Sequence, residues 1–316
     1  MFSRIVFLNL ILSVLFTFLS VNAEDFKKLL EECEKNEKTC PKAYENFKKS
    51  CEKGNAKGCL NIGILYEKGL GVKENLEKAS EYYKLACDMG EGKACNNLGG
   101  LYYRDKDYKE AAKYAKLACD MGDAEGCVNL AFLYHQELLG KGNYKEAAKY
   151  AKLACDMGKA LGCFNLALLY HQGLLGKKDY KEAVKYYKLA CDMGESKACF
   201  NLALFHYKGL LGKEDYKEAF KYYKLACDMG EARACFNLAF FYYEKGDLEK
   251  AAELFKIACD KCDAKSCANL AWSYENGKGV KQDYKEAAKY YKLACDMGDI
   301  KSCNRFDILT RCGLDK

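Results

Sequence analysis

Proline is almost absent from this chain of 316 residues, which contains only Pro41. Because proline removes a backbone donor and interrupts a helix, an all-helical array keeps few of them. An excess of charge of one sign is also lacking, since 51 Lys and Arg stand against 45 Asp and Glu, interleaved along the chain. This pattern indicates solvated helix faces and no nucleic-acid-binding patch, so no nucleic acid is expected as a partner.

Long hydrophobic segments are absent after the start of the chain, so no membrane-spanning helix is expected. The start itself has a basic residue, an apolar run from Ile5 to Leu19, and Val21-Asn22-Ala23 as a small-residue cleavage site. These features predict a signal peptide over residues 1–23, cleaved after Ala23. We therefore expect a secreted or periplasmic protein.

Cysteine, in contrast, is abundant and regular. Of 20 cysteines, sixteen form pairs with seven residues between the two members. The pairs recur at steps of 36 or 32 residues, which predicts a solenoid of stacked supersecondary units, and bonded pairs would place the protein where thiols oxidise. The pairs are Cys51 with Cys59, Cys87 with Cys95, Cys119 with Cys127, Cys155 with Cys163, Cys191 with Cys199, Cys227 with Cys235, Cys259 with Cys267, and Cys295 with Cys303.

One unit, Cys163 to Gly194, shows the predicted local fold. A first helix runs from Cys163 to about His171, and a second helix begins after Asp179, a suitable N-cap. Two cysteines eight positions apart on one helix would have Cα atoms about 12 Å apart, whereas a disulfide needs roughly 4.4–6.8 Å. If each pair is bonded, the chain must reverse between its members. Each bridge then joins the end of one helical hairpin to the start of the next.

The predicted fold is therefore all-α, a right-handed α-solenoid of disulfide-stapled helix-turn-helix repeats. Residues 24–58 form an N-terminal capping helix pair, residues 59–298 seven repeats, and residues 299–316 a C-terminal capping helix. Cys33 and Cys40 span a helix–helix loop and are expected to pair. Cys262 and Cys312 are each either a free thiol or an intermolecular link. We expect a monomer.

Further residues that recur in these units point to a known family. The unit near the C-terminus resembles the Sel-like repeat of the tetratricopeptide superfamily. The cysteine pair with the phrase Leu-Ala-Cys-Asp-Met-Gly resembles the Helicobacter cysteine-rich protein family. The residues that carry the first resemblance include Asn269-Leu270-Ala271, Tyr274, Gly277-Lys278-Gly279-Val280, Asp283-Tyr284, Ala287-Ala288 and Tyr291.

The resemblance implies a secreted repeat protein of a type assigned as penicillin-binding, with weak β-lactamase activity. A β-lactam or peptidoglycan-like ligand would then be its partner. The residues themselves give little support, because Ser-x-x-Lys occurs only as Ser50-Cys51-Glu52-Lys53 and no Lys-Thr-Gly or Ser-Asp-Asn element accompanies it. The catalytic residues are therefore unknown. The alternative is a non-enzymatic scaffold that binds an extended peptide, a protein or an envelope ligand through its concave face.

Metal and cofactor chemistry is not expected either. The chain has three histidines, His135, His171 and His206, each near the end of the first helix of a different repeat. A zinc site needs three or four ligands around one ion, and these residues lie one repeat apart. We expect exposed histidines on the loop side, no bound metal and no cofactor.

One polar residue recurs two positions after the second cysteine of a pair, and we call this set the asparagine ladder. It comprises Asn61, Asn97, Asn129, Asn165, Asn201, Asn237 and Asn269, and the last six are the candidate ligand-binding residues of the concave face. Carboxamides there can bind an extended peptide backbone through both donor and acceptor, and the preceding Phe164, Phe200 and Phe236 can add apolar pockets. Alternatively, each asparagine makes a structural bond to the preceding turn, and both roles can hold together. In paired tyrosines such as Tyr186 and Tyr187, one ring is expected to pack between helices and the other to be less buried and available as a contact residue.

Overall fold

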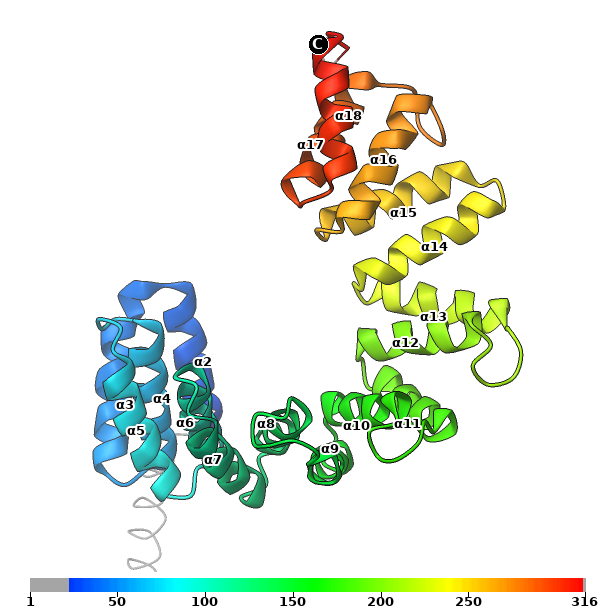
Figure 1. Ribbon diagram of the computed structural model, residues 1–316. Coiled ribbons are helices and arrows are strands. Elements are labelled where there is room, and N and C mark those ends of the chain that lie inside the picture. Colours follow the sequence, from blue (N-terminus) through cyan, green and yellow to red (C-terminus); the bar gives the residue numbers. More distant parts are fainter. Residues whose placement is uncertain (1–22, 315–316) are drawn as a thin grey trace, which may run out of the picture. The chain divides into compact units, whose positions relative to one another are not determined.

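The computed structural model describes residues 23–314, so the predicted signal peptide lies outside the described residues except for Ala23. Within this range the chain folds into 17 α-helices and a 3₁₀ turn at Glu37–Thr39, without strands (Figure 1). The predicted fold class, an all-α solenoid of disulfide-stapled helical repeats, is confirmed. The helices are α2 (Ala23–Lys35), α3 (Cys40–Glu52), α4 (Ala56–Lys68), α5 (Leu76–Asp88), α6 (Gly92–Arg104), α7 (Tyr108–Asp120), α8 (Ala124–His135), α9 (Tyr144–Asp156), α10 (Ala160–Gln172), α11 (Tyr180–Asp192), α12 (Ser196–Tyr207), α13 (Tyr216–Asp228), α14 (Ala232–Glu244), α15 (Leu248–Asp260), α16 (Ala264–Asn276), α17 (Tyr284–Asp296) and α18 (Ile300–Arg311).

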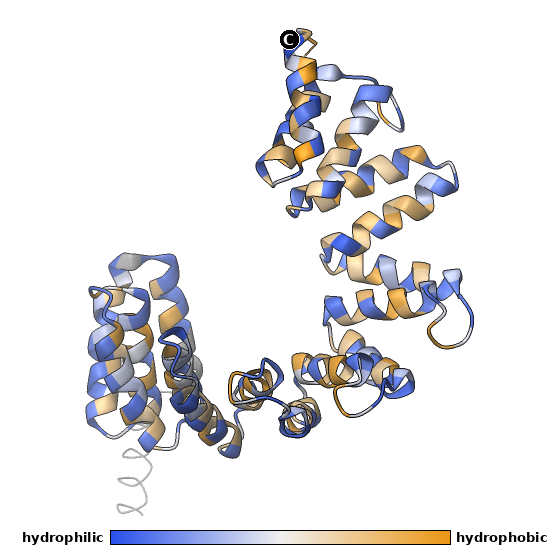
Figure 2. Cartoon of the chain, in the orientation of Figure 1, coloured by the Kyte–Doolittle hydropathy of each residue, from blue (hydrophilic) through white to orange (hydrophobic). Residues whose placement is uncertain are grey.

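The chain divides into two compact units, one ending at Leu153 and one beginning at Ala154, within α9. In the first unit α4 packs on α5, and α6 on α7. In the second unit the pairs are α10/α11, α12/α13, α14/α15 and α16/α17. Within each unit, second helices also pack on the first helix of the next repeat, as α7 does on α8 and α13 on α14. A first helix is therefore held on two sides, and most helices carry both hydrophobic and hydrophilic residues (Figure 2).

The second helices begin at a capping residue that the sequence repeats. The carboxylates of Asp107, Asp179 and Asp215 each accept from the backbone N–H three residues later. This bond satisfies one of the amides that a helix leaves without a partner at its first turn. Asp179 thus has the N-cap role that the sequence predicts.

The first helices begin earlier than the sequence pattern suggested. α10 starts at Ala160, three residues before Cys163, and Lys159 occupies its N-cap position. The chain reverses within a few residues because Gly158 and Gly194 adopt positive φ angles of 82° and 93° after the preceding helix. Both cysteines of a pair therefore lie on helices, on either side of a short joint.

The second cysteine of every regular pair lies near the start of a hairpin, as predicted. The helix that carries it begins three residues before the cysteine, however, and not at the cysteine itself. A helix begins where its N-cap allows, and each cap stands four residues before the cysteine. The residues concerned are Cys59 on α4, Cys95 on α6, Cys127 on α8, Cys163 on α10, Cys199 on α12, Cys235 on α14, Cys267 on α16 and Cys303 on α18.

Nine disulfides bridge these joints in the described part of the chain. Eight join the regularly spaced pairs, with Cα–Cα distances of 4.6–4.8 Å. They link Cys51 to Cys59, Cys87 to Cys95, Cys119 to Cys127, Cys155 to Cys163, Cys191 to Cys199, Cys227 to Cys235, Cys259 to Cys267, and Cys295 to Cys303.

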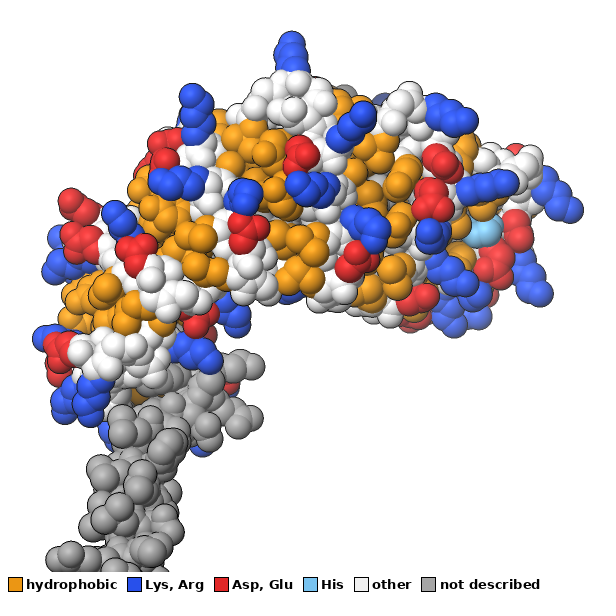
Figure 3. Space-filling model, turned by 90° about the horizontal axis from the view of Figure 1, so that it is seen from below, with side chains coloured by type: hydrophobic (Ala, Val, Ile, Leu, Met, Phe, Trp, Pro, Cys, Tyr) orange, Lys and Arg blue, Asp and Glu red, His pale blue; other side chains and the backbone are white. Residues whose placement is uncertain are grey.

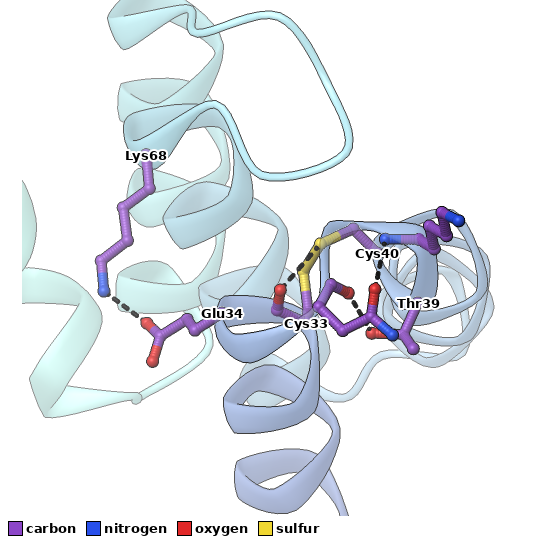
Figure 4. Close-up of a disulfide and its surroundings, with 7 residues drawn as sticks. Cys33, Glu34, Thr39, Cys40 and Lys68 are labelled. Carbon is purple, nitrogen blue, oxygen red and sulfur yellow. Dashed lines mark hydrogen bonds and ion pairs between the residues drawn. A yellow bond between two sulfur atoms is a disulfide. The ribbon is translucent and has the colours of Figure 1, made fainter.

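The ninth disulfide closes the N-terminal end of the array. It joins Cys33 to Cys40 between α2 and α3, where Lys68 of α4 also forms a 2.6 Å ion pair with Glu34 (Figure 4). The two remaining cysteines, Cys262 and Cys312, are unpaired and exposed. So many disulfides indicate an oxidising, extracytoplasmic environment.

The surface carries charges of both signs. On the face drawn in Figure 3, Lys and Arg alternate with Asp and Glu around hydrophobic patches, without a field of one sign. Several cation–anion pairs, such as Lys185 with Glu182, lie three residues apart on one helix and are exposed. Among the helices that the structure describes, none is long and apolar enough to cross a membrane.

Candidate functional site on the asparagine-bearing helices

The asparagine ladder lies on the first helices of the repeats, each member one turn into its helix. Asn61 is buried, Asn129 is exposed, and the other five are half-buried. These positions place a carboxamide beside the second helix of the preceding repeat. The contacts of each side chain therefore decide between a structural and a binding role.

Three members of the ladder bond to a tyrosine of the preceding second helix. Asn97 bonds to Tyr83, Asn201 to Tyr187, and Asn237 to Tyr223, always fourteen residues earlier in the chain. These tyrosines are at most 1% exposed. A buried hydroxyl without a partner is costly. The Tyr83 hydroxyl also donates to Glu67, and that of Tyr187 lies 3.2 Å from His171 Nδ1, so the carboxamide is a second partner there and the partner that Tyr223 has across its joint.

This environment changes the pKa of the tyrosine hydroxyl groups. Burial raises the pKa of Tyr223 to about 12, and the bond from Asn237 acts in the opposite direction. Burial likewise raises the pKa of Tyr187, against the bond from Asn201. Both phenols therefore stay neutral at any physiological pH, with the asparagine as donor.

Two ladder members make other bonds because the residue fourteen positions earlier has no hydroxyl. Ala115 precedes Asn129, whose Nδ2 donates instead to Oδ1 of Asn96 at 2.8 Å. Phe255 precedes Asn269, whose Nδ2 donates to the Lys265 carbonyl oxygen at 2.8 Å. The ladder is thus a structural bond wherever a tyrosine faces it.

After the ladder, the equivalent position two residues beyond Cys303 holds an arginine. Arg305 on α18 lies fourteen residues after Tyr291, and both bond to the buried carboxylate of Glu275. The Arg305 guanidinium is the largest cause that holds the pKa of Glu275 below its usual value, and the Tyr291 hydroxyl adds to it, donating at 2.8 Å. This network joins α16, α17 and α18 at the end of the array.

Beside the ladder in the second unit lies a group of exposed rings, which we call the aromatic face. It consists of Tyr207 on α12, Phe240 and Tyr243 on α14, and Trp272 on α16, each 38–44% exposed. The ring centroids of Phe240 and Tyr243 are 6.4 Å apart, and those of Tyr243 and Trp272 are 6.3 Å apart. Tyr207 and Phe240 line the same cavity. Four large rings are thus held at the surface on three neighbouring first helices.

Two cavities open along the aromatic face. One of about 330 Å³ lies between α12 and α14 and is lined by Tyr207, Asn237 and Phe240. The other, of about 740 Å³, is lined by Asn269 and Trp272 together with the Glu275–Arg305 pair. Each cavity therefore combines a ladder carboxamide with an exposed ring.

Sequence reasoning selected different aromatic residues. Phe164 and Phe200 pack inward against the buried rings of Tyr187 and Tyr223, at centroid distances of 5.8 and 5.9 Å. Phe236 does line the larger cavity. The missed residues follow the second cysteine of a pair by five or eight positions, and this spacing was a signal that could have found them.

The tyrosine pairs follow the prediction in part. Tyr187 and Tyr223 pack between helices, while their neighbours Tyr186 and Tyr222 are half-buried. In the last pair Tyr290 and Tyr291 are both buried.

The three histidines lie near the ends of first helices, as predicted, but the prediction that they are exposed was wrong. His135, His171 and His206 lie within helices and are half-buried. His171 lies edge-on to Phe205, 4.8 Å between centroids, and its Nδ1 is 3.2 Å from the Tyr187 hydroxyl. Burial lowers the pKa of His171, so its ring is neutral above the ordinary histidine range. The ring of His206 stacks on Tyr222 at 5.7 Å between centroids, so packing against aromatic neighbours covers His171 and His206 in part.

The one Ser-x-x-Lys sequence lies at the end of a helix. Ser50 lies in the last turn of α3, and Lys53 is the C-cap residue of that helix. No group of three or more His, Cys, Asp or Glu residues that could hold a metal ion occurs within residues 23–314. The geometry here is that of a helix end beside the Cys51–Cys59 joint.

Sequence comparison matches the Sel1 repeat model to seven segments of the chain, residues 37–55, 56–91, 124–159, 160–195, 196–231, 232–261 and 264–299. The chain belongs to the Sel1 repeat family. The interval at residues 93–122 matches a tetratricopeptide repeat model. No match to a curated protein is found.

Among solved structures, a Sel1 repeat protein from Oxalobacter formigenes is 21% identical, with a TM-score of 0.74 and coverage of 93% of both chains. A protective antigen of uropathogenic Escherichia coli strains displaying an SLR fold is 26% identical, with a TM-score of 0.67 over 86% of this chain. The match spans 60% of that antigen. Helicobacter pylori cysteine rich protein B is 30% identical over 40% of this chain and 94% of its own, with a TM-score of 0.32. The first two matches support the Sel1 repeat fold, and the third does not assign the chain to the Helicobacter cysteine-rich family.

Proposed function

We propose that this Sel1 repeat protein is a non-enzymatic interaction scaffold that binds an extended peptide segment of a partner protein along the aromatic face. The observation that carries the proposal is the contiguous set of exposed rings from Tyr207 to Trp272, beside Asn237 and Asn269 and above two cavities. Exposed apolar patches of this kind mark interaction sites, and Tyr and Trp are frequent in the residues that dominate binding energy.

The carboxamides supply the polar part of such a site. An asparagine side chain has two N–H donors and one acceptor, and a bond to tyrosine uses one donor. Asn237 therefore retains groups that can bond to a peptide backbone while it holds Tyr223. The structural and the binding roles of the ladder are compatible at this position.

The reading as a weak β-lactamase has no comparable support. It came from the resemblance alone, and Ser50, in the last turn of α3, has no Lys-Thr-Gly or Ser-Asp-Asn element to accompany it in the sequence. We therefore favour the scaffold, whose ligand is a peptide and whose binding requires no reaction.

The test is a selection of random 12-residue peptides on the oxidised protein, followed by affinity measurements on single variants. Phe240→Ala and Trp272→Ala should each weaken the selected peptides by roughly 30-fold, the effect of losing about 2 kcal/mol at a central aromatic contact. Leu225→Ala is the matched control, because Leu225 is also 40% exposed but lies on the second helix α13. The selected peptides should bind the Leu225→Ala variant as tightly as the unmodified protein.

Two results would refute the proposal. One is a selection that yields no peptide with saturable binding. The other is peptides whose affinity falls as much in the Leu225 variant as in the two aromatic variants.

A further inference from the structure

A cavity of about 150 Å³ lies among α6, α7 and α8 of the first unit. Two small residues coincide here: the position of Ala115 holds an aromatic ring in most other repeats, and that of Gly100 holds a large apolar residue in all of them. Ala115 takes the place of the inter-helix ring, and Gly100 replaces a large apolar residue; a Cβ atom on Gly100 would meet nothing within 4 Å. The residues equivalent to Ala115 elsewhere are Phe47, Tyr83, Ala151, Tyr187, Tyr223, Phe255 and Tyr291, and those equivalent to Gly100 are Ile64, Phe132, Leu168, Leu204, Phe240 and Trp272; the repeat of Ala151 thus lacks the ring as well, but has Phe132 where this one has Gly100.

The preceding repeat shows what normally fills this space. The ring of Tyr83 packs so closely on Gly63 that two ring atoms lie 2.5 Å from where a Cβ of Gly63 would stand. Its hydroxyl bonds to Asn97. In the cavity, Gly99 has the place of Gly63 and Asn129 that of Asn97, while the ring itself is missing.

The dimensions and lining of the cavity match that missing ring. A buried apolar cavity of about 150 Å³ is large enough for benzene. Leu133 and Ala115 form apolar walls, and the exposed rings of Tyr103 and Phe132 border it with centroids 6.1 Å apart. The carboxamide of Asn129 lines the same space, held by Asn96. Asn96, which also lines the cavity, accepts one N–H of this carboxamide, and the second N–H of Asn129 remains to bond one hydroxyl of a bound ring.

We propose that this cavity binds a tyrosine side chain of a partner peptide, whose ring replaces the tyrosine that the repeat lacks and whose hydroxyl accepts from Asn129. The proposal rests on the scaffold function and names the side chain that the first unit recognises. The peptide would thus supply the aromatic ring that most of the other repeats contain as a residue of their own. Tyr103 and Phe132 would contact the edges of the inserted ring.

The probe for this proposal is p-cresol, the side chain of tyrosine without its backbone, with toluene as the matched compound lacking the hydroxyl. The measurement is the change in amide chemical shifts of Gly99, Gly100 and the Asn129 side chain during titration. We expect saturable shifts at these positions, with p-cresol binding several-fold more tightly than toluene. Asn129→Ala should remove this preference.

Ala115→Tyr tests the site from within, because it restores the repeat's own ring. It should weaken p-cresol at least tenfold, and Gly100→Leu, which fills the cavity from α6, should do the same. Lys116→Tyr adds the same side chain one residue away at an exposed position and should leave binding unchanged.

Absence of saturable shifts in the unmodified protein, or full binding in both filled variants, would overturn the proposal. Equal affinity for toluene and p-cresol would overturn the assignment to tyrosine. Because the assay uses no peptide, its failure is distinct from a failure of peptide binding at the aromatic face.

Discussion

The bond between Tyr223 and Asn237 makes a quantitative prediction about what holds neighbouring repeats together. Tyr223 is 1% exposed, and Asn237 is the partner of its hydroxyl across the joint between α13 and α14. Asn237→Ala leaves that hydroxyl buried and unsatisfied, which should cost about 1–3 kcal/mol of unfolding free energy. Tyr223→Phe removes the hydroxyl and should cost about 1 kcal/mol.

The double variant is the informative one. With both polar partners gone, no buried hydroxyl is left unsatisfied. The double variant should therefore lose much less unfolding free energy than the two single variants together, with a coupling energy of about 1 kcal/mol. The assay is urea denaturation of the oxidised protein followed by far-ultraviolet circular dichroism. Asn129→Ala is the control, because Asn129 is exposed, and should change stability by less than about 0.5 kcal/mol. If the losses of unfolding free energy in the two single variants add up to that of the double variant within about 0.3 kcal/mol, a structural bond between Tyr223 and Asn237 is refuted.

Three further predictions concern the joints and the buried rings. Replacing Cys191 and Cys199 by alanine should lower stability by about 2.6 kcal/mol, the chain-entropy value for the loop that they close, and denaturant titration measures this loss. Cys262→Gly should raise stability by about 1 kcal/mol in the same assay, because Cys262 has a φ of 64° where other repeats place glycine; an unchanged midpoint would contradict this. The pKa of Tyr223 is higher in the folded than in the unfolded protein, so between about pH 10 and 12 the folded state keeps a proton that the unfolded state loses. The unfolding free energy should therefore fall as pH rises through this range, and this fall should be smaller in Tyr223→Phe.

The joints between hairpins could be predicted from the sequence, because the Cα–Cα distance that a disulfide allows is too short for two cysteines eight positions apart on one helix. A pair such as Cys191 and Cys199 cannot bond along one helix, so the chain had to reverse, and the Met-Gly step supplies the reversal. The start of each first helix could not be read from the cysteines, since a helix begins where its cap allows. α10 therefore starts at Ala160 rather than at Cys163.

The candidate site was harder to predict because it depends on contacts between repeats. The recurrence of asparagine was visible, but its tyrosine lies fourteen residues away on another helix, and only packing brings the two together. The same holds for exposure: Phe200 and Phe240 are both aromatic residues of first helices, yet one packs inward on Tyr223 and the other stands at the surface. Residue type was therefore predictable, whereas the face on which each ring lies was not.

Trp272 provides the most direct test of the proposed binding surface, because it is the one tryptophan of the chain and belongs to the aromatic face. The measurement is its fluorescence while a selected peptide without tryptophan is titrated onto the protein. The account predicts a shift of the emission to shorter wavelength and weaker quenching by acrylamide, both saturating with peptide binding, as the ring leaves water. Saturable peptide binding that leaves both the emission and the quenching of Trp272 unchanged would contradict it.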